Sequence, residues 1–157
     1  MIQNQEGDEE GAMWSAATAI PGGALFKGVG TVARASRVVV KEYQILNKYG
    51  TRIVRGASLY EKHHAIMSAW AKAIDPLYRT SQAPVIVLSE ANHLATQRAF
   101  EAWAKAEGYS ARSVPWAKLS LRQVGALTEK MFDAANVPAA ARAAYWKAFA
   151  DYVGGLY

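Results

Sequence analysis

The chain has 157 residues, of which 52% are hydrophobic and 20% are charged, so it fits one folded domain with or without an arm and is not disordered throughout. It contains no cysteine, which excludes disulfide bridges and a cysteine-ligated zinc site. The net charge of +5 favours anionic partners such as nucleic acid or an anionic membrane surface, although a solvated basic surface explains it equally well.

The first 40 residues differ in composition from the rest of the chain. Residues 1–11 are polar and acidic, and residues 12–40 are rich in small apolar residues and glycine. We expect residues 1–40 to form a flexible arm or linker with a short helix near 24–36, and residues 41–157 to form the folded domain. Lys27 and a Pro-Gly-Gly sequence interrupt the apolar run, so no stable membrane span is expected.

The first half of the folded domain mixes predicted strands with one helix. Residues 38–46 are apolar with polar interruptions, and their element type is ambiguous. Residues 51–54 are β-branched around an arginine and predict a short strand, and residues 84–88 predict another. Between them, apolar residues at helical spacing predict a helix over 63–74 that ends before Pro76.

The second half is predicted to be helical. Ser89 is expected to cap a helix over 91–105 that Gly108 closes, and Ser120 to cap a helix over 121–135. Pro138 is expected in the first turn of a last helix that ends near Gly154. Aromatic residues recur at helical spacing on these helices and predict core rather than base-stacking surfaces: Phe100, Trp103, Tyr145, Trp146 and Phe149. The fold class is therefore α+β and mostly helical.

The three histidines of the chain form the strongest functional pattern. His63 and His64 are adjacent, and His93 stands in Asn92-His93, at the junction between a predicted strand and a predicted helix. Adjacent residues in an extended segment point in opposite directions, so one imidazole can hold a metal while the other faces a substrate. Imidazole serves as a neutral metal ligand or as a base. A His-His pair also occurs by chance in core or surface positions, and the ordered frame with a strand and Asn-His favours function.

Residues 59–107 resemble the HNH/endonuclease VII superfamily, whose core is a pair of strands followed by a helix around one divalent metal. More narrowly, they resemble polymorphic bacterial toxin nucleases whose signatures end in His-His. The Gly/Ala-rich stretch before residue 40 resembles the segment that leads into the C-terminal toxin domains of Rhs-type proteins. The resemblance implies a small ββα-metal (His-Me finger) core with additional C-terminal helices.

The resemblance also implies roles for individual residues. His63 would be a metal ligand, and His64 would be the general base that activates water. His93 would be the ligand from the helix side, with Asn92 as a further ligand or as the residue that orients the loop. Glu61 matches an acidic position that supports the site in some members.

One position departs from the family pattern. Several members carry another histidine four residues after the one matched by His93, and here that residue is Gln97. Metal binding would then rest on two or three protein groups with waters and the phosphate. This favours a loosely held divalent ion, with Mg²⁺ expected first and Mn²⁺, Ni²⁺ or Zn²⁺ as alternatives.

The resemblance implies a metal-dependent endonuclease that cuts DNA with low sequence specificity and acts as a bacterial competition toxin. Lys62, Arg79 and Arg98 lie close enough in sequence to contact substrate phosphates, although each fits a solvated surface charge equally well. Such a toxin would be delivered from a bacterium on a parent scaffold, act in the target-cell cytoplasm and have a cognate immunity protein. Two alternatives stay open: a metal-independent RNase that uses His64 and His93 as a base/acid pair, and a non-catalytic helical module that binds nucleic acid.

Overall fold

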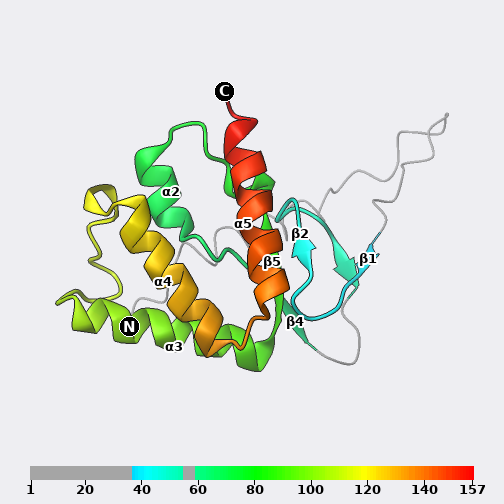
Figure 1. The fold of residues 1–157 in the computed structure, drawn as a ribbon, viewed down its shortest axis with the longest axis horizontal. Coiled ribbons are helices and arrows are strands. Elements are labelled where there is room, and N and C mark those ends of the chain that lie inside the picture. The colour runs from blue at the N-terminus through cyan, green and yellow to red at the C-terminus, as the bar shows by residue number, and fades with distance from the viewer. Residues whose placement is uncertain (1–36, 55–58) are drawn as a thin grey trace, which may run out of the picture. The chain divides into compact units, whose positions relative to one another are not determined.

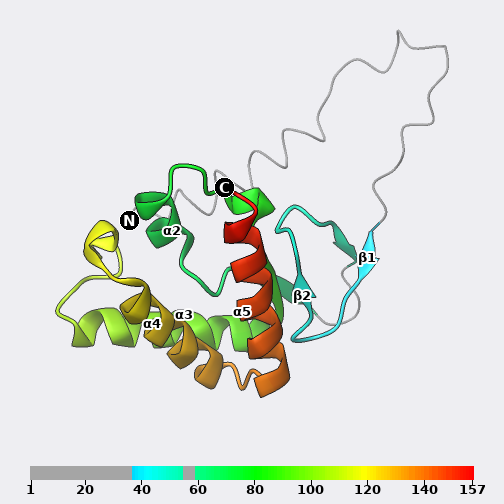
Figure 2. The same cartoon turned by 45° about the horizontal axis from the view of Figure 1, so that its top comes forward.

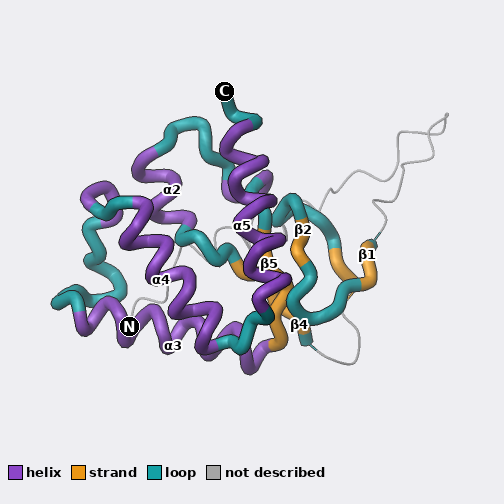
Figure 3. Tube along the Cα trace, viewed as in Figure 1, coloured by secondary structure: helices purple, strands orange, loops and turns teal. Residues whose placement is uncertain are grey.

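A computed structural model describes residues 37–54 and 59–157 (Figure 1). The strands are short: β1 (Val38–Val39), β2 (Ile45–Leu46), β3 (Ile53–Val54), β4 (Tyr60–His63) and β5 (Val85–Ser89). The α-helices are longer: α2 (Ser68–Ile74), α3 (Glu90–Ala106), α4 (Leu121–Ala134) and α5 (Ala139–Gly154). Two 3-10 turns, η1 (Thr80–Gln82) and η2 (Trp116–Lys118), complete the order. About half of the described residues are helical, as Figure 3 shows, so the expected α+β, mostly helical class is confirmed.

The strands form two small sheets. In the three-stranded sheet, β5 lies in the middle and pairs antiparallel with β2 on one side and β4 on the other. In the second sheet, β1 and β3 run parallel, with Val38 opposite Ile53. The β4–β5 register places His63 opposite Ile86 and Tyr60 opposite Ser89, the last residue before α3.

The central strand β5 is buried on both faces, which explains its uninterrupted apolar sequence. Ile86 and Leu88 belong to the larger core, which the helices cover. Val85 and Val87 point the other way, into a smaller cluster with Val40 and Leu46. All four of these β5 side chains are fully buried.

Helix α3 follows β5 without a loop, because Ser89 ends the strand and caps the helix. The Ser89 hydroxyl accepts a hydrogen bond from the backbone N–H of Asn92, at 3.4 Å. At the other end, Gly108 has a φ of 79°, in the left-handed region that suits glycine after a helix. His93 is thereby fixed in the first turn of α3, beside the end of the strand pair.

The two C-terminal helices pack over α3 and the sheet (Figures 1 and 2). Ser120 and Gln123 form a capping box at the start of α4, where each side chain bonds the other's backbone N–H. Phe132 of α4 and Tyr145 of α5 meet edge to face in the core, with ring centroids 5.6 Å apart. Helix α5 also contacts β2, so it links the helical layer to the sheet.

Several sequence expectations need correction in detail. The predicted helix over 63–74 begins only at Ser68, because His63 ends a strand whose partner β5 takes its backbone hydrogen bonds. Leu121, the first residue of α4, is 59% exposed, although its helix is otherwise buried along one face. Pro138 precedes α5 as its N-cap instead of lying in its first turn. The ambiguous segment 38–46 contains β1 and β2, and the strand predicted over 51–54 is β3.

Other expectations fall outside what the structure describes. The helix predicted near 24–36 lies among residues that are not described, and the boundary at residue 40 stays a prediction. Within residues 37–54 and 59–157, no helix has the length and apolar content required to cross a membrane.

Candidate active site

Strand β4 presents alternate side chains to the two faces of the sheet. The register pairs Glu61 with Leu88 and His63 with Ile86, so these two β4 residues share the face covered by the helices. Lys62 is opposite Val87 and therefore faces the smaller apolar cluster. His64, two residues after Lys62, lies on the same side, because its ring contacts Tyr49 of that cluster. The neighbouring side chains of His63 and His64 thus lie on opposite faces of the sheet.

His63 meets His93 on the helical face. Their ring centroids are 5.3 Å apart and their planes are inclined by 67°, an edge-to-face arrangement. His63 is only 9% exposed, and its Nε2 is buried with no hydrogen-bond partner. Burial, with smaller contributions from His93 and His64, lowers the pKa of His63 to about 3. Burial also lowers the pKa of His93, which the nearby charge of Glu61 partly opposes.

These two imidazoles fit a metal site in part. A buried nitrogen without a partner is costly unless something binds it, and a neutral imidazole is the form that coordinates a metal. His63 and His93 are therefore the residues that would hold an ion. Among the residues that the structure describes, no group of three or more His, Asp or Glu side chains is close enough to form a complete ligand set. Remaining ligands would have to come from water and substrate.

His64 is held by different partners. Its Nε2 lies 3.1 Å from the carbonyl oxygen of Thr80, and because a carbonyl only accepts, Nε2 carries the proton. The lone pair is then on Nδ1. The ring stacks on Tyr49 with centroids 4.6 Å apart. Burial lowers the pKa of His64 to about 4, against the opposing effect of the Thr80 hydrogen bond, so the ring is neutral at pH 7 and able to accept a proton.

Asn92 belongs to a separate polar network. Its side-chain amide donates to Glu42 Oε1 at 2.6 Å and to the Tyr43 hydroxyl at 3.0 Å. Glu42 also accepts from the backbone N–H of Ser89, and Tyr43 donates to the carbonyl of Ala135. Burial raises the pKa of Glu42, but the hydrogen bonds from Ser89 and Asn92 outweigh it and the net pKa is lowered. This geometry favours the second role considered for Asn92, which is to orient the start of α3.

The predicted phosphate contacts differ in their surroundings. The ammonium of Lys62 donates to the backbone carbonyls of Tyr49 and Thr51. Arg79 is exposed, and its guanidinium donates to the carbonyls of Pro76 and Tyr78. Arg98 is exposed on α3. Of the three, Lys62 is the one whose charge contributes to the lowered pKa of His64.

Sequence patterns did not identify the residues that anchor the segment after the His-His pair. The Tyr145 hydroxyl accepts a hydrogen bond from the N–H of Ile66 at 2.9 Å, and Thr128 donates to the carbonyl of Ala65 at 3.0 Å. Tyr152 accepts from the N–H of Arg79 at 2.8 Å. These contacts span 63 to 79 residues of sequence, so only the tertiary fold reveals them.

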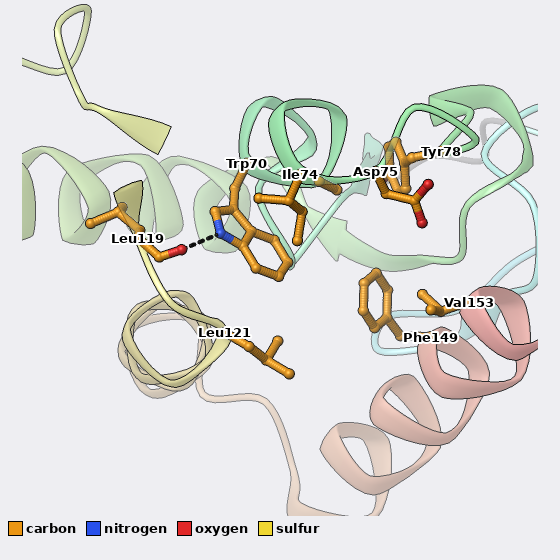
Figure 4. Close-up of a pocket in the computed structure, with 9 residues that line it drawn as sticks. Trp70, Ile74, Asp75, Tyr78, Leu119, Leu121, Phe149 and Val153 are labelled. Atoms are coloured by element: carbon orange, nitrogen blue, oxygen red, sulfur yellow. Dashed lines mark hydrogen bonds between the residues drawn. The ribbon is translucent and has the colours of Figure 1, made fainter. Parts of the chain in front are cut away.

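An apolar pocket of about 340 Å³ lies apart from the histidines, between α2, the start of α4 and α5 (Figure 4). The Trp70 indole closes one side, where its N–H donates to the carbonyl of Leu119 at 2.9 Å. Among the described residues, Asp75 is the only charged one in its lining. The other lining residues are Trp70, Ala71, Ile74, Tyr78, Leu119, Leu121, Phe149 and Val153. No histidine reaches it, so it is not part of the candidate active site.

The structure thus has an antiparallel strand pair followed directly by a helix, with histidines at the strand end and in the first helical turn. Over residues 57–154, the chain matches the model of a family described as HNH/Endo VII superfamily toxin with a SHH signature. The chain belongs to this family, which confirms the resemblance of residues 59–107 to HNH/endonuclease VII superfamily toxins. Membership implies a nuclease toxin with a nucleic-acid substrate and a cognate immunity protein. No solved structure matches the chain.

Proposed function

We propose that this chain is a metal-dependent endonuclease that hydrolyses DNA phosphodiester bonds with low sequence specificity. The observation that carries the proposal is that the two adjacent histidines at the end of β4 have different partners on different faces of the sheet. His63 faces His93 as a pair of neutral imidazoles, and His64 faces away with its Nε2 proton held by a carbonyl. One side is suited to holding an ion and the other to accepting a proton.

His64 acts as the general base. Its Nδ1 takes a proton from the attacking water, while the Thr80 carbonyl keeps the Nε2–H in place and fixes the tautomer. The approach of an anionic phosphate raises the pKa of His64 from its low value, so the base becomes stronger when substrate is bound. A neutral ring at pH 7 is ready for this step without first losing a proton.

His63 and His93 would hold the divalent ion, and Asn92 keeps the first turn of α3 in register with the strand. When bound, the ion polarises the phosphate and stabilises the charge of the transition state. Two imidazoles suit Mn²⁺, Ni²⁺ or Zn²⁺, whereas Mg²⁺ prefers oxygen ligands. Glu61 supports the pair through its charge, which opposes the lowering of the His93 pKa.

Arg79 and Arg98 are the proposed phosphate contacts, since both are exposed. We propose that the immunity protein presents an acidic surface to this basic chain, whose net charge is +5. We also propose delivery from a bacterium on a parent scaffold of the Rhs type, and action in the cytoplasm of the target cell as a competition toxin. The proposal for DNA rests on chemistry that needs no 2′-hydroxyl, and RNA is tested beside it.

The test is cleavage of supercoiled plasmid and of an RNA of matched length with Mg²⁺, Mn²⁺, Ni²⁺ or Zn²⁺. We expect nicking of plasmid that EDTA abolishes. His64→Ala is expected to keep only a small residual rate that added metal does not raise, whereas His93→Ala regains part of its activity at high metal, because it loses a ligand but keeps the base. Gln97→Ala, exposed one turn after His93, serves as the matched control and should cleave normally.

The alternatives give different results. A metal-independent RNase would ignore EDTA and cut only RNA. A binding module would retain plasmid in a salt-dependent complex without cutting it under any ion.

A further inference from the structure

The face of the His64 ring is covered by Tyr49. The two rings are stacked with an interplanar angle of 28° and centroids 4.6 Å apart. Tyr49 lies between β2 and β3 and packs against the smaller apolar cluster. The ring plane of His64 is therefore set by a residue that comes from outside the β4–β5–α3 unit.

Tyr49 and Thr80, the two partners of the His64 ring, are joined to each other. The N–H of Tyr49 donates to the carbonyl of Ala83 at 2.9 Å, and the N–H of Gly50 donates to the carbonyl of Ser81 at 3.0 Å. Thr80 directly precedes Ser81 in η1. The His64 imidazole thus contacts both of these joined segments: its face packs on Tyr49, and its Nε2 bonds Thr80.

Lys62 completes this arrangement. It lies two residues before His64 on the same side of the strand, and its ammonium donates to the carbonyls of Tyr49 and Thr51. The same Nζ is 4.3 Å from the centroid of the Tyr49 ring, within the range of a cation–π contact. The family signature names serine before the His-His pair, and a serine there would carry no charge to place over the ring.

We propose that Tyr49 is a positioning residue for His64 and that Lys62 holds Tyr49 in place. This inference rests on the proposed role of His64 as general base. A base must be aimed at its water, and a displacement of about 1 Å at a reacting group can cost about 100-fold in rate. A stacked ring favours one orientation of its partner over the others by a factor of about 2 to 10 in population. On the His64 imidazole, the stacked Tyr49 ring and the hydrogen bond to Thr80 act together.

The first experiment compares Tyr49→Leu with Tyr49→Phe on a fluorescent duplex DNA under metal-saturated conditions. We expect Tyr49→Leu to lower kcat at least about threefold with KM unchanged. Tyr49→Phe should have the kcat of the wild type, because it keeps the ring. Tyr60→Leu is the matched control, because it removes a ring that packs against the same apolar cluster, whereas the ring stacked on His64 is that of Tyr49. An equal loss in Tyr60→Leu and Tyr49→Leu would overturn the proposal.

A double-mutant cycle separates positioning from general stability. In a His64→Ala background, Tyr49→Leu should cause no further loss, because the residue acts only through the missing imidazole. An undiminished effect in that background would overturn the proposal. NMR of ¹⁵N-labelled histidine in metal-free protein gives a readout besides activity: wild type should show His64 as one Nε2–H tautomer, and Tyr49→Leu a mixture.

Lys62→Met distinguishes positioning from phosphate binding, and it carries the test if Tyr49→Leu does not fold. A positioning role predicts a lower kcat with unchanged DNA affinity and unchanged salt dependence. A phosphate contact predicts weaker DNA binding and a salt slope reduced by about one, and this result would overturn the role given to Lys62.

Failure of the inference can be told from failure of the proposed function. If His64→Ala cleaves as wild type does, His64 is not the base and the proposed function fails first. If His64→Ala is inactive while Tyr49→Leu and Lys62→Met match wild type in kcat and tautomer, the function stands and the positioning role is refuted.

Discussion

Replacing Tyr145 with phenylalanine removes one oxygen atom from the middle of the core. That oxygen accepts the N–H of Ile66 at 2.9 Å, and Tyr145 is only 1% exposed. The phenylalanine ring keeps the edge-to-face contact with Phe132, so the change creates no large cavity. The buried N–H is left without its acceptor, which costs about 1–3 kcal/mol. For a domain of this size each kcal/mol corresponds to a fall in Tm of about 4 °C.

The assay is thermal and urea unfolding of metal-free protein followed by circular dichroism, with Tyr157→Phe as the exposed control. We expect a lower Tm and an unchanged m-value for Tyr145→Phe, and no change for the control. Because Ile66 follows the His-His pair by two residues, DNA cleavage well below the Tm should also fall. A Tm within about 1 °C of wild type, measured with equal m-values, would refute the reasoning by showing that the N–H finds another partner.

Three more predictions follow from the same contacts. Without metal, stability should fall as the pH drops from about 6.5 toward 4, by up to about 1.4 kcal/mol per pH unit for each of His63 and His64. The reason is that the pKa values of His63 and His64 in the folded protein, about 3 and about 4, lie below the unfolded value, so the unfolded chain binds protons first. Urea midpoints measured at pH 7 and pH 5 test this prediction, and equal midpoints would contradict it. Asn92→Ala should lower the urea midpoint by the equivalent of about 1–2 kcal/mol, because Glu42 and Tyr43 lose the amide that they contact, and an unchanged midpoint would contradict this. Trp70→Phe should lower the urea midpoint by the equivalent of about 1–2 kcal/mol through loss of the Leu119 hydrogen bond, and an unchanged midpoint would mean that this bond adds nothing.

The elements with strong local signals could be predicted from the sequence. Ser89 and Ser120 cap helices where expected, because a hydroxyl before a periodic apolar run satisfies the first N–H groups of a helix. The apolar run at 85–88 formed a strand, since it is too short for a helix and is β-branched. Gly108 ended its helix for the same kind of local reason.

The residues around the histidines could be predicted only in part. The juxtaposition of His63 with His93 was expected from the strand–helix junction and is present in the structure. The partners of His64 could not be foreseen, because Tyr49 and Thr80 meet it through the tertiary fold and have no spacing relative to it. The helix expected over 63–74 was too long, since apolar spacing alone does not show that β5 pairs with the residues before Ala65.

Helix α5 holds the backbone on both sides of the histidine site, through Tyr145 at Ile66 and Tyr152 at Arg79. During translation, the ribosome therefore completes all three histidines before it makes the helix that fixes them. A stop codon or frameshift anywhere between His93 and Tyr145 would leave every proposed catalytic side chain encoded. It would still inactivate the toxin, because α5 would be missing or incomplete. Genes of this kind can be silenced by lesions far from the residues that do the chemistry, so intact histidines in a shortened copy are no sign of an active product.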